Sequence, residues 1–96
     1  MDNLVILLEK ILIDRENRED LINYFQNKIF NINLNKDPNF NKDKFEILNE
    51  LAYDLDFYEH NPELRKEDPS YYGEDRLNVE IKKALIKINK LNILNI

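Results

Sequence analysis

Apolar residues recur at helical spacing along almost the whole chain, and this pattern limits the fold more than any other feature. Four segments carry it, and we expect their buried faces to be Leu4, Leu7, Leu8, Ile11 and Leu12; Leu21, Ile22, Phe25 and Ile29; Phe45, Leu48, Leu51, Ala52 and Leu55; and Leu77, Ile81, Ala84, Leu85 and Ile88. Such i, i+3, i+4, i+7 spacing indicates amphipathic helices. The sequence therefore predicts an all-α fold.

The segments between these faces carry the signals that end and begin helices. Asn17 is the expected cap of the second helix, and acidic residues occupy the first turn that follows it. The asparagine-rich stretch 31–43 contains an Asp-Pro pair and reads as a loop. Pro62 predicts that the third helix ends near His60, because the residue before a proline disfavours helical geometry. The stretch 29–35 alternates weakly and suits either a short strand or a fraying helix end.

Length and connection lengths set the architecture. With 96 residues and no internal repeat, the chain is expected to be one domain over residues 1–96. Four helices with fairly short connections favour a single-domain antiparallel four-helix bundle.

Charge and composition limit the partners. The net charge of −5 has the wrong sign for binding nucleic acid or anionic membrane, and the right sign for a basic protein. No apolar run reaches the length of a membrane span, and Glu9 and Lys10 interrupt the N-terminal run in a way that argues against a signal peptide. The absence of cysteine fits a reducing compartment, so a cytoplasmic location is expected.

The whole net charge lies in one segment, 54–77 (DLDFYEHNPELRKEDPSYYGEDRL). It holds eight acidic and three basic residues, so the rest of the chain balances at 11 of each. The only glycine, the only histidine and four of the ten aromatic residues also fall there. Turns between helices require helix-breaking residues such as proline and glycine, but they do not require this excess of acidic residues.

The residues of that segment give little support for a catalytic site or a metal site. One histidine and no cysteine exclude the usual zinc sets, and Glu59 and Arg65 stand where a calcium loop needs glycine and glutamate. Paired acids such as Asp56 and Glu63 could act as acid and base, but that work needs a cleft that a small bundle lacks. His60 suits a helix C-terminus as well as a base. We therefore expect no metal, no cofactor and no enzymatic activity.

Two adjacent tyrosines, Tyr71 and Tyr72, leave two interpretations open. One ring could close the core while the other lies on the surface, or the exposed tyrosine could anchor a protein partner.

Two stretches, ELAYDLDFYEHNPELR (50–65) and YYGEDRLNVEIKKAL (71–85), resemble the colicin D-type immunity proteins. They are similar also to immunity proteins of contact-dependent growth inhibition systems. The likeness covers residues 50–91, and the first half of the chain agrees in helix order and length. The resemblance implies a four-helix bundle that binds the C-terminal nuclease domain of a tRNA-cleaving toxin, with acidic side chains in place of the RNA phosphates.

Matching the acidic run places the expected site on Asp56, Glu59 and Asn61. Asn61 departs from the family pattern, which has an acid there, and Glu63 is the candidate for the missing charge. The full set of expected partner-binding residues is Asp54, Asp56, Glu59, Asn61, Glu63, Tyr71, Tyr72, Glu74 and Asp75.

The sequence thus predicts a cytoplasmic immunity protein that inhibits a cognate basic nuclease (tRNase) toxin, without binding nucleic acid, membrane or a small-molecule substrate itself. Three alternatives remain. The paired tyrosines suit a DNase-colicin-type immunity protein; an acidic segment that only confers solubility suits a small helical adaptor; and a carboxylate with a raised pKa would indicate a hydrolase.

Overall fold

The computed structural model describes residues 2–32 and 41–94, and these residues are helical with short connections. The elements in chain order are α1 (Asp2–Ile13), α2 (Arg18–Phe30), α3 (Lys42–Asp54), the 3₁₀ helix η1 (Leu55–Phe57), α4 (Pro62–Arg65) and α5 (Glu74–Leu94). Within the described ranges the β structure is limited to one isolated bridge. The all-α expectation is confirmed.

The core is built from the four predicted apolar faces. Buried residues of these faces are Leu4, Leu7, Leu8, Ile11, Ile22, Phe25, Ile29, Leu48, Leu51, Ala52, Leu55, Leu77, Ile81, Ala84 and Ile88. The remaining four, Leu12, Leu21, Phe45 and Leu85, are half-buried and pack against that core. Burying a Leu, Ile or Phe side chain contributes about 1.5–3 kcal/mol, so these faces supply most of the driving force for folding.

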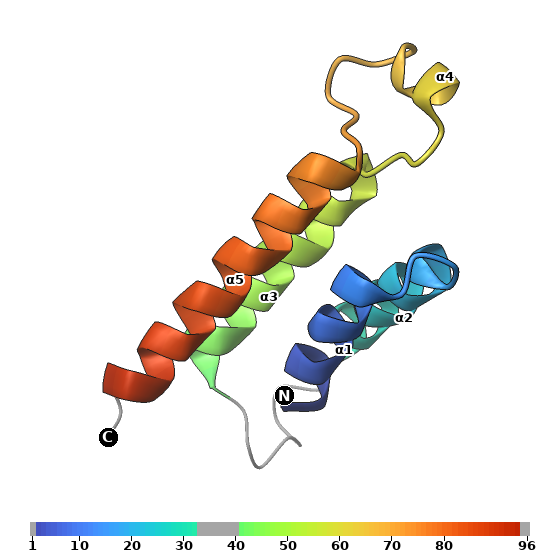
Figure 1. Ribbon diagram of the computed structural model, residues 1–96. Coiled ribbons are helices and arrows are strands. Elements are labelled where there is room, and N and C mark those ends of the chain that lie inside the picture. The colour runs from blue at the N-terminus through green and yellow to red at the C-terminus, as the bar shows by residue number, and fades with distance from the viewer. Residues whose placement is uncertain (1, 33–40, 95–96) are drawn as a thin grey trace.

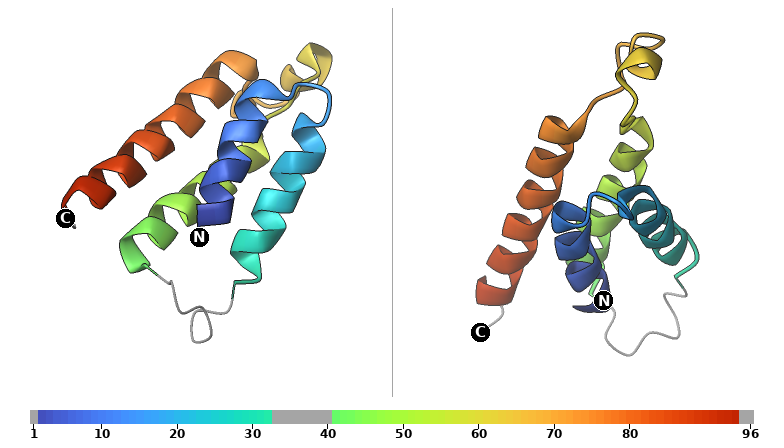
Figure 2. Two further views of the ribbon diagram at one scale, coloured as in Figure 1. Left: turned by 60° about the horizontal axis from the view of Figure 1, so that its bottom comes forward. Right: turned by 45° about the vertical axis from the view of Figure 1, so that its right-hand side comes forward.

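The four long helices pack as two neighbouring pairs. α3 lies beside α5, and α1 lies beside α2; across the pairs, α2 contacts α3 and α1 contacts α5 (Figures 1 and 2). Each long helix therefore has two helical neighbours, and the apolar faces meet in the middle. None of the helices in the described part of the chain combines the length and apolarity needed to cross a membrane.

One helix cap and one helix boundary differ from expectation. Asn17 is the N-cap residue of α2, as expected, but its side chain makes no capping hydrogen bond; it donates instead to Asp14, and the hydrogen bonds from Asn17 lower the pKa of that carboxyl group. α3 ends at Asp54, well before His60, and the chain continues as η1. In the strand-like stretch 29–35, the first two residues belong to α2, and residues 33–35, like most of the expected loop 31–43, lie outside the described residues.

A buried arginine joins three helices at the α1–α2 corner. Arg18, only 3% exposed, donates from Nε to the carbonyl of Ile11 at 2.8 Å and from Nη2 to that of Leu12 at 3.0 Å. Carbonyls in the last turn of a helix have no partner within the helix, so the Arg18 side chain supplies the hydrogen-bond donors that the end of α1 lacks. Its Nη1 also lies 3.6 Å from an oxygen of Glu74, at the start of α5.

Candidate functional site

The segment 58–73, here called the lobe, projects beyond the ends of α3 and α5 and carries α4 (Figure 1). Its two ends are joined by a parallel bridge between Tyr58 and Tyr72. Tyr72 N–H donates to the carbonyl of Phe57, and Glu59 N–H donates to the carbonyl of Tyr72, both at 2.9 Å. The base of the lobe is therefore closed by backbone hydrogen bonds, and the residues beside it are held in place.

The two tyrosines have different environments. Tyr72 is buried, and its hydroxyl donates to the Asp54 carboxylate at 2.9 Å, while the guanidinium of Arg76 lies 4.9 Å from the centre of its ring. Burial, and then the hydrogen bond to Asp54, raise the pKa of the Tyr72 phenol well above its usual range. Tyr71 is 36% exposed. The question left open by the sequence is thus answered: Tyr72 closes the core and Tyr71 lies on the surface.

Carboxylates from two distant parts of the chain meet where α2 begins and η1 ends. We call Glu19, Asp56 and Glu59 the acidic corner. Glu19 and Asp56 line one shallow groove of about 180 Å³ between α2 and η1. Gln26 lies about two turns after Glu19 on α2. Its Nε2 donates to Asp56 at 2.7 Å and to the carbonyl of Ala52 at 2.9 Å, and these bonds hold η1 against α2.

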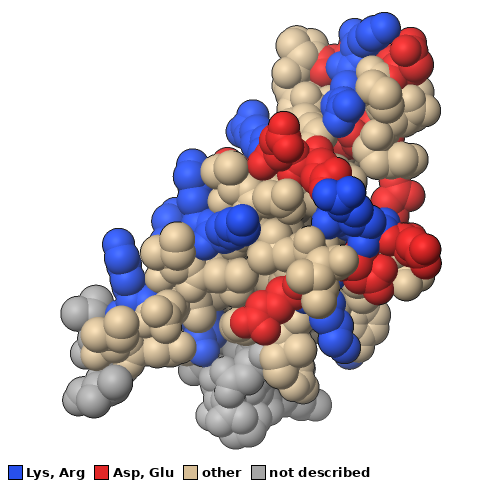
Figure 3. Space-filling model, viewed as in Figure 1, with Lys and Arg blue, Asp and Glu red and all other residues tan. Residues whose placement is uncertain are grey.

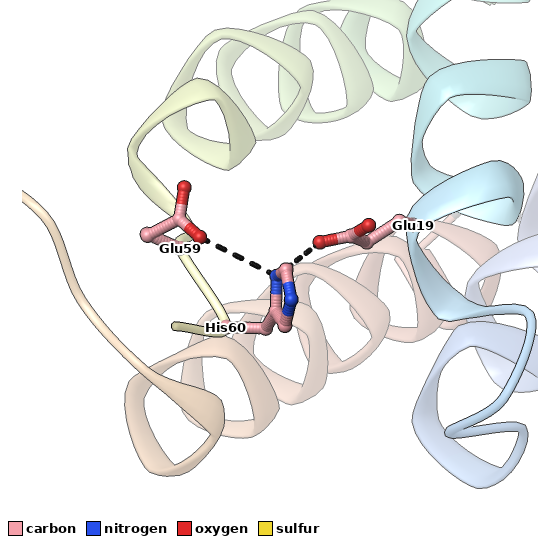
Figure 4. A group of neighbouring side chains, drawn as sticks. All are labelled: Glu19, Glu59 and His60. Atoms are coloured by element: carbon pink, nitrogen blue, oxygen red, sulfur yellow. Dashed lines mark ion pairs between the residues drawn. The ribbon is translucent and has the colours of Figure 1, made fainter. Parts of the chain in front are cut away.

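Two members of the acidic corner flank the histidine. His60 Nδ1 pairs with the Glu19 carboxylate and lies 3.4 Å from Oε1 of Glu59, so the two carboxylates face one imidazole nitrogen (Figure 4). Glu59 is half-buried, and the same Oε1 accepts the backbone N–H of Asn61 at 3.1 Å. Within the described residues, this is the group whose donor atoms are close enough together to hold a metal ion.

The other expected residues are dispersed. Asn61 caps α4 through a 2.9 Å bond to the N–H of Glu63, and the side chain of Glu63 pairs with Lys66 in the lobe. Glu74 is engaged by Arg15 at 2.8 Å as well as by Arg18. Asp75 is exposed and makes no ion pair in the described part of the chain. Glu19 is what links the two expected acids, because it shares a groove with Asp56 and lies close to Glu59. Asp56 and Glu59 have internal partners in Gln26 and His60, just as Glu63 and Glu74 have theirs.

Sequence reasoning missed Glu19 and Gln26. Both lie on α2, some thirty to forty positions before the residues they contact. No local pattern could have placed them there, because only the packing of α2 beside α3 brings them to η1.

The surface view shows how the charges divide (Figure 3). In this view most acidic side chains lie in the upper half, around the ends of the long helices and in the lobe, with basic side chains among them, and the lower part of α5 carries mainly basic side chains. Phe57, which follows Asp56 directly, is 42% exposed. Exposed aromatic rings are enriched at protein interfaces, and carboxylates steer the approach of a basic partner.

Comparison of the chain with family models, with curated proteins and with solved structures gives no match. Its function has to be inferred from the residues themselves.

Proposed function

We propose that the chain is a cytoplasmic immunity protein, a non-catalytic inhibitor that binds the basic nuclease domain of a tRNA-cleaving toxin. The observation that carries this proposal is the acidic corner, where Glu19 lines one groove with Asp56 and lies close to Glu59. Phe57, the next residue after Asp56, is exposed. A nuclease cleft is positive because it must hold phosphates, so fixed carboxylates can occupy it.

The two kinds of residue would contribute differently to binding. Charge complementarity mainly increases the association rate and orients the partner, to about 10⁸ M⁻¹s⁻¹ or more at low salt. Tight binding needs desolvated anchors, and an aromatic anchor is worth roughly 2 kcal/mol or more. Phe57 is the anchor nearest in sequence to the acids, and Tyr71 is a second one in the lobe.

An antiparallel four-helix bundle is the architecture expected for such an inhibitor, and the two neighbours of each long helix support it. The lobe then extends the bundle at one end, and it carries Glu59 of the acidic corner (Figure 1).

One alternative, a DNase-colicin-type immunity protein, rested on the pair of tyrosines Tyr71 and Tyr72. Because Tyr72 is buried, only Tyr71 is available to a partner, and the pair no longer favours DNase inhibition over tRNase inhibition.

The test uses charge reversal at the corner. Asp56→Lys together with Glu59→Lys should weaken binding to the toxin nuclease domain by about a hundredfold or more, since like charges would then face each other. The probe is the C-terminal domain of a secreted toxin encoded directly upstream, and binding is measured at low and physiological salt. Circular dichroism of the double variant checks that it keeps the helix content of the parent.

A matched control reverses two acids elsewhere. Glu9→Lys with Glu46→Lys changes the net charge equally, at exposed positions on α1 and α3. The control should retain the affinity of the parent and should still rescue cells that express the toxin. Equal affinities for the corner variant and the parent, or the absence of any toxin gene nearby, would contradict the proposal.

A further inference from the structure

The structure assigns a second property to two residues of the acidic corner: Glu19 and Glu59, together with His60, form a binding site for a first-row transition-metal dication such as Zn²⁺. The inference stands independently of toxin binding, because it rests on the donor atoms alone. These are Nδ1 of His60 and one carboxylate oxygen from each glutamate, and all lie within 4.8 Å of one another.

The spacing of the donors suits a metal ion. Zn²⁺ binds nitrogen and oxygen at about 2.0–2.2 Å, which places neighbouring donors of a tetrahedral site roughly 3.3 Å apart. His60 Nδ1 and Glu59 Oε1 are separated by 3.4 Å. The contact between His60 and Glu19 is closer and would open when a metal takes the position between them. Both side chains are more than half exposed, so they have room to make this adjustment.

The chemistry of the donors selects the class of ion. One imidazole with two carboxylates suits Zn²⁺ or Co²⁺, whereas Ca²⁺ and Mg²⁺ prefer sites made of oxygen alone. Two negative carboxylates also balance the charge of a dication. Asp56, which shares the groove with Glu19, adds further negative potential nearby.

The surroundings hold one of the donors in place before any metal arrives. Glu59 is anchored through its N–H to the carbonyl of Tyr72, and its Oε1 accepts from the N–H of Asn61. Hydrogen bonds of this kind orient metal ligands and are a regular part of metal sites. Glu19 comes from the first turn of α2, so a bound ion would fasten that helix to the base of the lobe.

The test measures Zn²⁺ binding to the full chain by calorimetry at pH 7.5, with no histidine tag because the chain has a single histidine. We expect saturable binding of one ion, with NMR shifts centred on residues 19 and 58–61. Glu19→Gln and His60→Gln should each weaken binding by about tenfold or more. Lowering the pH to 5.5 should weaken it as well, because protons compete for the same donors. Ca²⁺ should not displace the ion.

The control is Glu46→Gln, which removes the same charge from an exposed position near the start of α3, whereas Glu59 follows the end of that helix. It should leave Zn²⁺ affinity within about twofold, as expected for a distant screened charge. No saturable binding up to millimolar Zn²⁺, or an equal loss in Glu46→Gln and Glu19→Gln, would overturn the assignment. Glu59→Gln keeps an acceptor for Asn61, so a loss of binding in that variant reports on the ligand rather than on the fold.

Discussion

The hydroxyl of Tyr72 donates a 2.9 Å hydrogen bond to the carboxylate of Asp54, and this bond fastens the C-terminal end of the lobe to the last residue of α3. The bridge between Tyr72 and Tyr58 joins the other end of the lobe to the same tyrosine. Asp56 and Glu59 of the acidic corner follow Asp54 within five positions of the sequence.

Removing that hydroxyl should cost stability. Tyr72→Phe leaves the half-buried Asp54 carboxylate without its donor, and hydrogen bonds to charged groups contribute about 1.5–3 kcal/mol. We expect the free energy of unfolding in urea to fall by about that amount. Tyr71→Phe is the control, because Tyr71 is exposed and its change should stay within about 0.5 kcal/mol. Similar losses in the two variants would show that the bond to Asp54 adds little.

The same tyrosine makes stability depend on alkaline pH. In the unfolded chain a tyrosine loses its proton near pH 10, whereas burial raises the pKa of Tyr72 in the folded protein. The stabilisation is therefore complete below about pH 10 and is lost as the pH rises further, since the folded state then binds more protons than the unfolded state. Urea unfolding between pH 9 and 11 should show a steeper decline for the parent than for Tyr72→Phe. Parallel curves would contradict this assignment.

Arg18 should be the most sensitive charged residue of the chain. Arg18→Met keeps most of the volume but leaves the carbonyls of Ile11 and Leu12 without their donor, so we expect a loss of about 2–4 kcal/mol. Arg15→Met removes an arginine that also pairs with Glu74, but its side chain is 77% exposed, and the loss should be about 1 kcal/mol or less. Chemical denaturation of both variants distinguishes a buried helix cap from a surface ion pair.

The single glycine makes room for a neighbouring side chain and does not serve an unusual backbone conformation. Gly73 has no positive φ, but a Cβ there would lie 1.8 Å from Nη1 of Arg65, which otherwise donates to the carbonyl of Glu59 at 3.3 Å. Gly73→Ala should therefore displace Arg65, and the lost bond of about 1 kcal/mol offsets the reduced entropy of the unfolded chain.

A double-mutant cycle isolates that contact. In an Arg65→Ala background the clash is gone, and Gly73→Ala should stabilise the protein by about 0.4–1 kcal/mol, as measured by thermal unfolding. If the glycine substitution has the same effect in both backgrounds, Arg65 does not fix the identity of residue 73.

The helices could be predicted because their apolar period is local and complete. Faces such as that of Leu77 and Ile81 need no knowledge of the rest of the chain, and they are buried as expected. The end of α3 was misplaced because Pro62 marks only the last position a helix could reach. The chain leaves the α-helix earlier, where η1 leads to the backbone bonds between Phe57, Glu59 and Tyr72.

The site was predictable only in part. Asp56 and Glu59 stand out in a locally acidic run, but Glu19 and Gln26 reach them through helix packing, which no short pattern records. Arg18 was missed for a different reason: a charged side chain is expected at the surface unless all its donors are matched, and its carbonyl partners become visible only in three dimensions.

The backbone hydrogen bonds that close the base of the lobe also separate sequence changes in the lobe from sequence changes in the helices. Residues 61–71 lie beyond the bonds that join Phe57, Glu59 and Tyr72, and none of them is buried. Lengthening such a surface loop adds only about 0.6 kcal/mol of closure entropy for each doubling. Substitutions and insertions in the lobe can therefore accumulate without repacking the helices, and the surface offered there can diversify while the rest of the molecule is inherited unchanged.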